Sequence, residues 1–237
     1  MNKLQPPNIT LLGVDCIELI KKAFKEKATE GHLLGSVARG DSDEFSDLDV
    51  WITFKDEDIA DALEKRFEYY SQIGDIVHIC EPHQNAPING IQSFVLYKTK
   101  AGLLPVDYYL CPQSTSFITL ESKKLFGDIL LPTRETKLNP QKVSVSETYR
   151  IDFLICFIFN SIKKLARKEE NALGALFREY GYLEERYSIG VDSLIDTENT
   201  FMALEKVIKN IDMITNEKQK KALSEIFAFM KLVQSNN

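Results

Sequence analysis

The sequence has 237 residues, of which 44% are hydrophobic and 27% charged, a composition typical of a folded globular protein. This length allows one large domain or two modest ones. The formal net charge of -6 argues against a broad footprint on a nucleic-acid backbone, because such binding depends on clustered Lys and Arg. A polymeric nucleic-acid partner is therefore not expected, and any bound nucleotide should be small.

The sequence predicts a cytoplasmic protein without a membrane partner. Its longest mostly apolar run, residues 151–162, is interrupted by Asp152 and Asn160 and is too short to span a bilayer. The first ten residues lack the apolar core of a signal peptide. Four cysteines are far apart and form no CxxC pair, so we expect buried, reduced thiols.

Helical and strand patterns alternate in the first half of the chain. Residues 14–28 repeat apolar side chains at helical spacing after Asp15, which is placed to cap the start. Residues 55–70 form a second helical pattern with carboxylates in the first turn. Five apolar or β-branched runs predict a sheet of about five strands. These runs are residues 32–35, 49–54, 75–81, 91–98 and 103–110.

The pattern becomes almost wholly helical in the second half. Residues 116–127 suggest a helix closed by Gly127, and residues 131–142 resemble a linker with two prolines. A long apolar-faced helix over 146–170, another over 171–187 and two more up to 233 follow. We therefore expect an α+β domain at 1–140, with a mixed sheet flanked by helices, and a C-terminal helical bundle at 141–237.

Two carboxylates stand at the start of the strand expected at 49–54. Asp47 and Asp49 are two residues apart, so in a strand both side chains would leave the same face and repel each other. A divalent cation between them would remove that repulsion, and hard oxygen ligands suit Mg²⁺. Alternatively, Asp47 is only a turn residue before the strand.

Phosphate-binding groups precede this pair. Gly35 allows close approach of the backbone to a ligand, and exposed amides in a tight turn or at a helix N-terminus attract phosphate oxygens. Ser36 adds a hydroxyl donor and Arg39 a permanent positive charge.

A third carboxylate, Asp107, is flanked by apolar residues, where an unpaired buried charge would be costly. If its strand lies beside residues 49–54, Asp107 completes a cluster that binds one or two metal ions and helps deprotonate an attacking hydroxyl. Alternatively, it meets solvent at a strand end.

The segment "GSVARGDSDEFSDLDVWI" resembles the GSxxRG(x)nSDxD signature of the nucleotidyltransferase superfamily, to which DNA polymerase beta belongs. Gly35 and Ser36 match the glycine-serine pair, Arg39 and Gly40 the arginine-glycine pair, and Asp47 and Asp49 the metal carboxylates. Asp107 matches the third carboxylate less specifically. A catalytic domain followed by helices is similar to the bacterial aminoglycoside and lincosamide nucleotidyltransferases.

The resemblance implies transfer of a nucleoside monophosphate, with AMP from ATP as the first expectation, to a hydroxyl of a small molecule such as an antibiotic. Asp47, Asp49 and Asp107 would hold Mg²⁺, with Asp107 as second-metal ligand or general base. Gly35, Ser36 and Arg39 would bind the triphosphate. Lys163 or Lys164 lies in a segment similar to the helix that follows the catalytic domain in those enzymes, and would reach the phosphates. The alternative for these lysines is the solvated basic end of an amphipathic helix.

Two other functions stay open. One is an antitoxin-type enzyme that adenylylates a partner protein, although such enzymes are typically shorter and lack the C-terminal helices. The other is a noncatalytic nucleotide sensor, which would have no need of a metal-binding pair. A homodimer is a further open expectation.

Overall fold

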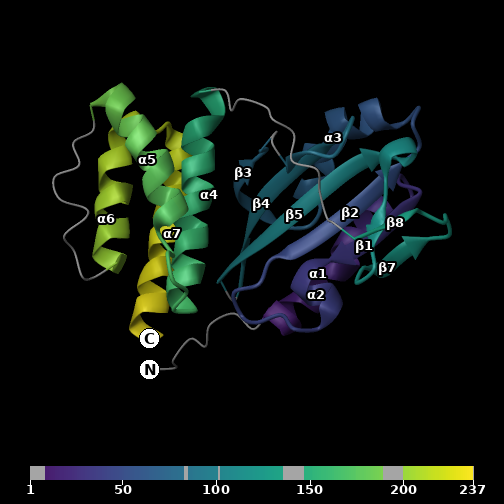
Figure 1. The fold of residues 1–237 in the computed structure, drawn as a ribbon, viewed down its shortest axis with the longest axis horizontal. Helices are drawn as coiled ribbons and strands as arrows, with labels where there is room; N and C mark the ends of the chain where they lie inside the picture. Colours follow the sequence, from purple (N-terminus) through teal and green to yellow (C-terminus); the bar gives the residue numbers. More distant parts are fainter. Residues whose placement is uncertain (1–8, 83–84, 101, 136–146, 189–199, 237) are drawn as a thin grey trace. The chain divides into compact units, whose positions relative to one another are not determined.

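The computed structural model describes residues 9–82, 85–100, 102–135, 147–188 and 200–236 (Figure 1). The chain forms two compact units, Met1–Val145 and Ser146–Asn237, which are described separately below. Within the described residues, the helices are too short or too polar to cross a membrane. The four cysteines are buried thiols outside any disulfide, as the sequence predicts.

The first unit is built on a mixed six-stranded sheet with the order β3-β4-β5-β2-β1-β7. Strands β2 and β5 at its centre are parallel, and the other neighbouring pairs are antiparallel. The strands are β1 (Glu30–Leu34), β2 (Leu48–Phe54), β3 (Asp75–Cys80), β4 (Ile91–Thr99), β5 (Gly102–Pro112) and β7 (Lys123–Gly127). A separate parallel pair consists of β6 (Ile118–Thr119) and β8 (Thr133–Arg134).

One face of this sheet carries the main core. Helices α1 (Ile9–Phe24) and α3 (Ile59–Ser71) bury Phe24 and Tyr70 against the apolar side chains of the central strands. The Tyr70 ring stacks on Tyr108 of β5, with centroids 4.5 Å apart. Because side chains alternate along a strand, the residues between these core positions face the opposite side of the sheet. That opposite side carries Asp49 and Asp107.

Two predicted helices differ from the structure. Helix α1 begins at Ile9, ahead of the predicted start at residue 14, so Asp15 lies inside the helix instead of capping it. The helix predicted over 116–127 is wrong, because this segment forms β6 and β7. β7 pairs with β1, and the Phe126 ring sits over Gly31, where a side chain would collide with it. This contact between distant segments outweighs the local helical spacing.

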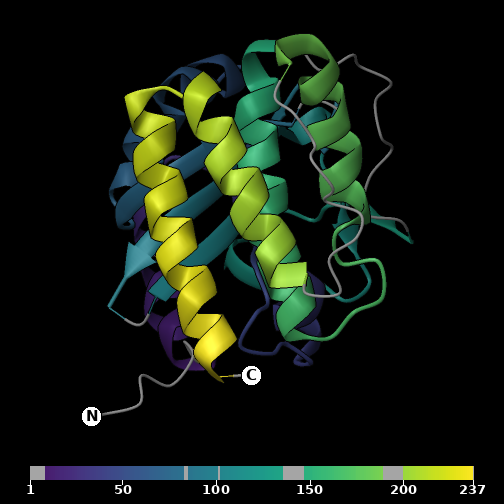
Figure 2. The same ribbon diagram turned by 90° about the vertical axis from the view of Figure 1, so that its left-hand side faces the viewer.

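The second unit contains four α-helices among its described residues. They are α4 (Glu147–Ala166), α5 (Gly174–Tyr187), α6 (Thr200–Ile211) and α7 (Glu217–Asn236). Helix α4 contacts the other three, and α6 and α7 lie side by side (Figure 2). The core of this unit consists of buried aliphatic side chains such as Ile158, Leu176, Leu204 and Ile226. The predicted cap at Ser146 lies outside the described residues.

Candidate active site

The predicted phosphate-binding residues lie where β1 passes directly into the short helix α2 (Gly35–Arg39). Gly35 has φ +66° and Gly40, at the other end, has φ +85°, a backbone region that favours glycine. The N–H groups of Gly40 and Asp41 donate to the Ser36 carbonyl at 2.8 and 3.1 Å. The glycine-serine pair is therefore held in a fixed strand-to-helix connection, with Ser36 half-buried.

A small hydrogen-bonded loop leads from α2 to the first carboxylate. Ser46 is buried and its hydroxyl donates to Asp43 Oδ1 at 2.8 Å while accepting from the Asp43 N–H at 2.9 Å. Asp43 Oδ1 also accepts from the Phe45 N–H at 3.0 Å. Such side-chain bonds replace backbone ones in tight turns. Asp43 and Ser46 thus fix the backbone immediately before Asp47.

The structure brings the second and third carboxylates into direct register. Asp49 of β2 pairs with Asp107 of the parallel strand β5, so the strand adjacency expected from the sequence is observed. On its other side, Asp49 pairs with Leu34, the last residue of β1 before Gly35. Asp47 comes one residue ahead of β2. All three carboxylates are half-buried, and the glycine-serine connection begins beside them.

All three carboxylates affect the pKa of Tyr109. Burial raises the pKa of Tyr109 well above its usual range, and Asp107, Asp49 and Asp47, in that order, raise the pKa further. A negative charge disfavours a phenolate only over a short distance. The three carboxylates therefore all lie near the buried Tyr109 side chain.

Gln92 connects Tyr109 to the carboxylates. It pairs with Tyr109 in the register of β4 and β5, and its Nε2 donates to Asp107 Oδ1 at 2.9 Å and to the Tyr109 hydroxyl at 3.3 Å. Sequence reasoning singled out neither Gln92 nor Tyr109 as a site residue. Neither spacing nor composition reveals this link, because it crosses from one strand to another.

A network of aromatic rings and hydroxyl groups lies on the face of the sheet that carries Asp49 and Asp107. The rings of Trp51 and Tyr109 stack with centroids 5.6 Å apart. The Trp51 indole N–H donates to the Ser116 hydroxyl at 2.7 Å, and Thr53 shares a 2.5 Å hydrogen bond with that same hydroxyl. Because these polar groups are buried and bonded, they make a rigid support behind Asp49.

Arg39 lies at the surface with two acidic neighbours. Its Nε donates to Asp41 Oδ2 at 3.1 Å, and its Nη1 donates to Glu121 Oε2 at 3.4 Å. The hydrogen bond to Asp41 is the largest cause of a raised pKa for Arg39. The guanidinium thus remains fully charged, and its role at a phosphate stays a prediction.

Lys163 belongs to the second unit, in α4. Its side chain is buried, with Nζ 5.6 Å from the centroid of the Phe159 ring. This burial differs from the solvated basic helix end that was the alternative interpretation. Its predicted contact with the phosphates stays a prediction.

The donor chemistry of Asp47, Asp49 and Asp107 fits a hard divalent cation, since Mg²⁺ is bound by carboxylate oxygens together with substrate phosphates. Even so, among the described residues no three His, Cys, Asp or Glu side chains are gathered closely enough to form a finished metal site. Mutual repulsion of the three carboxylates favours such a separated arrangement. These residues remain candidates for metal binding.

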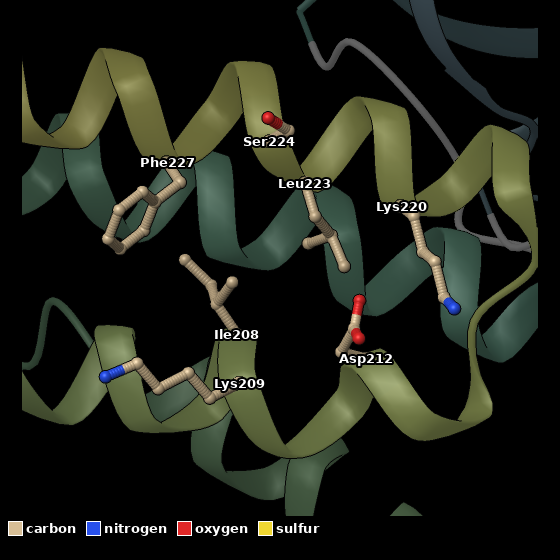
Figure 3. A pocket seen from close by; sticks show the side chains of 7 residues that line it. All are labelled: Ile208, Lys209, Asp212, Lys220, Leu223, Ser224 and Phe227. Carbon is tan, nitrogen blue, oxygen red and sulfur yellow. The ribbon is translucent and has the colours of Figure 1, made fainter.

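A pocket of about 350 Å³ lies within the second unit, between α6 and α7 (Figure 3). Ile208, Leu223 and Phe227 form its apolar part, with Asp212 and Lys220 near one end. The two lysines that line it are paired with glutamates, Lys209 with Glu205 and Lys220 with Glu217.

Comparison with known proteins identifies the fold of the first unit. Residues 17–98 match the family model described as a nucleotidyltransferase domain. A comparison with curated proteins finds no significant match. Among solved structures, the chain is similar to the cyclic dinucleotide synthase CdnE of Elizabethkingia meningoseptica, solved with GTP and Apcpp. The identity is 10% and the TM-score 0.31, over 99% of this chain and 96% of that chain. A likeness at this level indicates neither a substrate nor a product.

Proposed function

We propose that the chain is a nucleotidyltransferase enzyme that transfers AMP from ATP to a hydroxyl of a small molecule, since its residues 17–98 match the nucleotidyltransferase domain model. The proposed acceptor class is the aminoglycoside or lincosamide antibiotics, which would make the protein a resistance enzyme. The proposed location is the cytoplasm, where ATP and Mg²⁺ are available.

The observation that supports this proposal is the register of Asp49 with Asp107, next to the connection that begins at Gly35. Nucleotidyl transfer needs carboxylates and phosphate-binding groups around one phosphorus atom, because its catalysis depends on positioning and on neutralising charge. Bound Mg²⁺ would supply charge neutralisation at the phosphate oxygens. We propose Asp47 and Asp49 as its principal ligands.

In the proposed reaction, an acceptor hydroxyl attacks the α-phosphorus of ATP. A new bond forms between the acceptor oxygen and phosphorus, the bond from the α-phosphorus to the bridging oxygen breaks, and pyrophosphate leaves with that electron pair. Asp107 accepts the proton of the attacking hydroxyl as general base. The Gly35 amide and the Ser36 hydroxyl bind the leaving phosphates and orient them opposite the acceptor.

The acceptor proposal draws on the net charge of the chain and on the presence of a second, helical unit. The formal net charge of -6 favours encounter with a polycationic aminoglycoside. We propose that the second unit, with helices α4, α5, α6 and α7, binds the acceptor.

A labelling assay tests the proposal. The protein is incubated with Mg²⁺, one of the four α-labelled nucleoside triphosphates and a panel of aminoglycosides and lincosamides, and labelled acceptor and pyrophosphate are measured. We expect equal amounts of both products with ATP and an antibiotic, and about a hundredfold to a thousandfold less of both with the Asp49→Asn variant. Absence of transfer to every antibiotic with all four triphosphates would overturn the acceptor class.

A further inference from the structure

We propose that Gln92 is a positioning residue that fixes the orientation of the Asp107 carboxylate, an inference that rests on the proposed function. Gln92 lies on β4, the neighbour of β5 on the side away from β2. Its Nε2 is 2.9 Å from Asp107 Oδ1.

The backbone alone does not determine where the Asp107 oxygens point. The strand fixes the direction of the Cα–Cβ bond, but the last torsion of an aspartate side chain is broad and has no sharp rotamer. A general base must present one oxygen to a proton at hydrogen-bond distance. Some neighbouring donor must therefore restrict this torsion.

The two residues in direct register with Asp107 cannot supply that donor. Asp49 on β2 is a carboxylate and would repel it, while Phe94 on β4 has no polar side-chain atom. Gln92 is the diagonal neighbour, paired with Tyr109, and diagonal positions lie within reach of a long side chain. Its amide thus meets Asp107 from the strand opposite Asp49.

The orientation of the Gln92 amide follows from the same contact. An ionised carboxylate only accepts hydrogen bonds, so the NH₂ end of the amide must face Asp107. The second donor contact, to the Tyr109 hydroxyl at 3.3 Å, keeps that end in place. Gln92 is only 5% exposed, which leaves its side chain little freedom to rotate away.

The other end of the amide indicates that the residue serves more than stability. Gln92 Oε1 is buried and has no hydrogen-bond partner among the described residues. A buried acceptor without a partner disfavours the folded state, and an apolar side chain of similar size would avoid this cost. A polar residue kept at such a position is typical of functional sites, where activity and stability conflict.

This conflict gives a test that separates positioning from a structural role. In the Gln92→Leu variant of the whole chain, we expect kcat for nucleotidyl transfer to fall about tenfold to hundredfold, as for other residues that orient a ligand or base. The KM for ATP should stay within about twofold, because the amide acts on the base and not on the triphosphate. The melting temperature should stay within about 2 °C or rise.

Ser93→Ala is the matched control on the same strand. Ser93 is fully buried on the opposite face of the sheet, where it accepts from the Tyr70 hydroxyl at 3.0 Å and donates to Glu81 at 2.8 Å. This variant should lower the melting temperature with kcat unchanged. Tyr109→Phe, which keeps the bond from Gln92 to Asp107, should lower kcat less than about threefold. A kcat within twofold of wild type for Gln92→Leu, or an equal loss for Tyr109→Phe, would overturn the proposal.

A crystal structure of Gln92→Leu supplies a readout that needs no acceptor. We expect the Asp107 carboxylate to be rotated or to occupy two orientations, compared with one in the wild-type protein. An unchanged single orientation in the variant contradicts the proposal. If the wild-type protein transfers no nucleotide, the proposed function fails, and this comparison still decides the role of Gln92.

Discussion

Asp49 and Asp107 are direct register partners on the two parallel strands at the centre of the sheet. Two half-buried carboxylates in this relationship repel each other, and a cation near both would offset that repulsion. Removing one of the two charges should therefore favour the folded state.

The first prediction concerns this repulsion. Asp49→Asn removes one negative charge without changing side-chain size, so the folded protein should be as stable as the wild type or more stable. Nucleotidyl transfer should fall about a hundredfold to a thousandfold, because charge neutralisation at the phosphates is lost. Thermal unfolding and the labelling assay measure the two effects. Asp61→Asn, which removes an exposed carboxylate on α3, is the control and should leave transfer unchanged.

The second prediction concerns pH and His32. His32 is buried on β1, where its Nε2 meets Glu30 Oε1 at 3.0 Å and Lys124 meets the same oxygen at 3.1 Å. Burial lowers the pKa of His32 below its usual 6.5, although Glu30 opposes this and Lys124 adds to it. The unfolded chain therefore binds the proton more readily than the folded protein.

It follows that neutral His32 contributes fully to the free energy of unfolding above about pH 6.5. This contribution is lost as the pH falls from there toward the lower pKa that His32 has in the folded state. Urea unfolding of the wild type and of His32→Gln between pH 8 and pH 5 measures this. The wild type should lose more stability than the variant over that window. If the free energy of unfolding changed equally with pH in both proteins, or rose in the wild type at low pH, the lowered pKa of His32 would be contradicted.

The sequence was sufficient to predict the elements that local patterns determine. Strong apolar periodicity predicted α3, and apolar runs predicted the central strands. The pair Asp47 and Asp49 could be recognised because both lie in one short segment. The adjacency of Asp107 could be stated only as a condition, since pairing of β2 with β5 depends on the whole sheet.

Contacts between distant segments account for what the sequence did not predict. β7 forms against β1, with Phe126 over Gly31, and no local signal in residues 116–127 indicates that partner. Gln92 reaches Asp107 only through the register of β4 and β5. Ser36 was expected in a turn or at a helix start, and in the structure it lies in the first turn of the short helix α2.

The third prediction concerns the support behind the carboxylates. Ser116→Ala leaves the Trp51 indole N–H and the Thr53 hydroxyl without their shared buried partner. An unsatisfied buried donor costs about 1–3 kcal/mol, so we expect about 2 kcal/mol less free energy of unfolding, measured by urea denaturation. Ser114→Ala, an exposed position in the same connection, should change the free energy by less than about 0.5 kcal/mol. Equal stability of the two variants would show that the network is not stabilising.

The fourth prediction separates two roles of Arg39. As a phosphate-binding residue, Arg39 must leave Asp41 and Glu121 and donate to the triphosphate, whereas as a surface ion pair it has no effect on catalysis. For Arg39→Ala we expect the KM for ATP to rise about fivefold to tenfold with kcat little changed, because the lost contact exists before and during the reaction. The melting temperature should stay within about 2 °C, since exposed ion pairs contribute little to stability.

Glu121→Gln is the matched control for Arg39. It removes one carboxylate that competes with the phosphates for the guanidinium, so the KM for ATP should stay the same or fall slightly. Added salt should reduce the difference between wild type and Arg39→Ala, because it screens exposed charges. An unchanged KM in Arg39→Ala at low salt would show that the guanidinium serves only the surface pairs with Asp41 and Glu121.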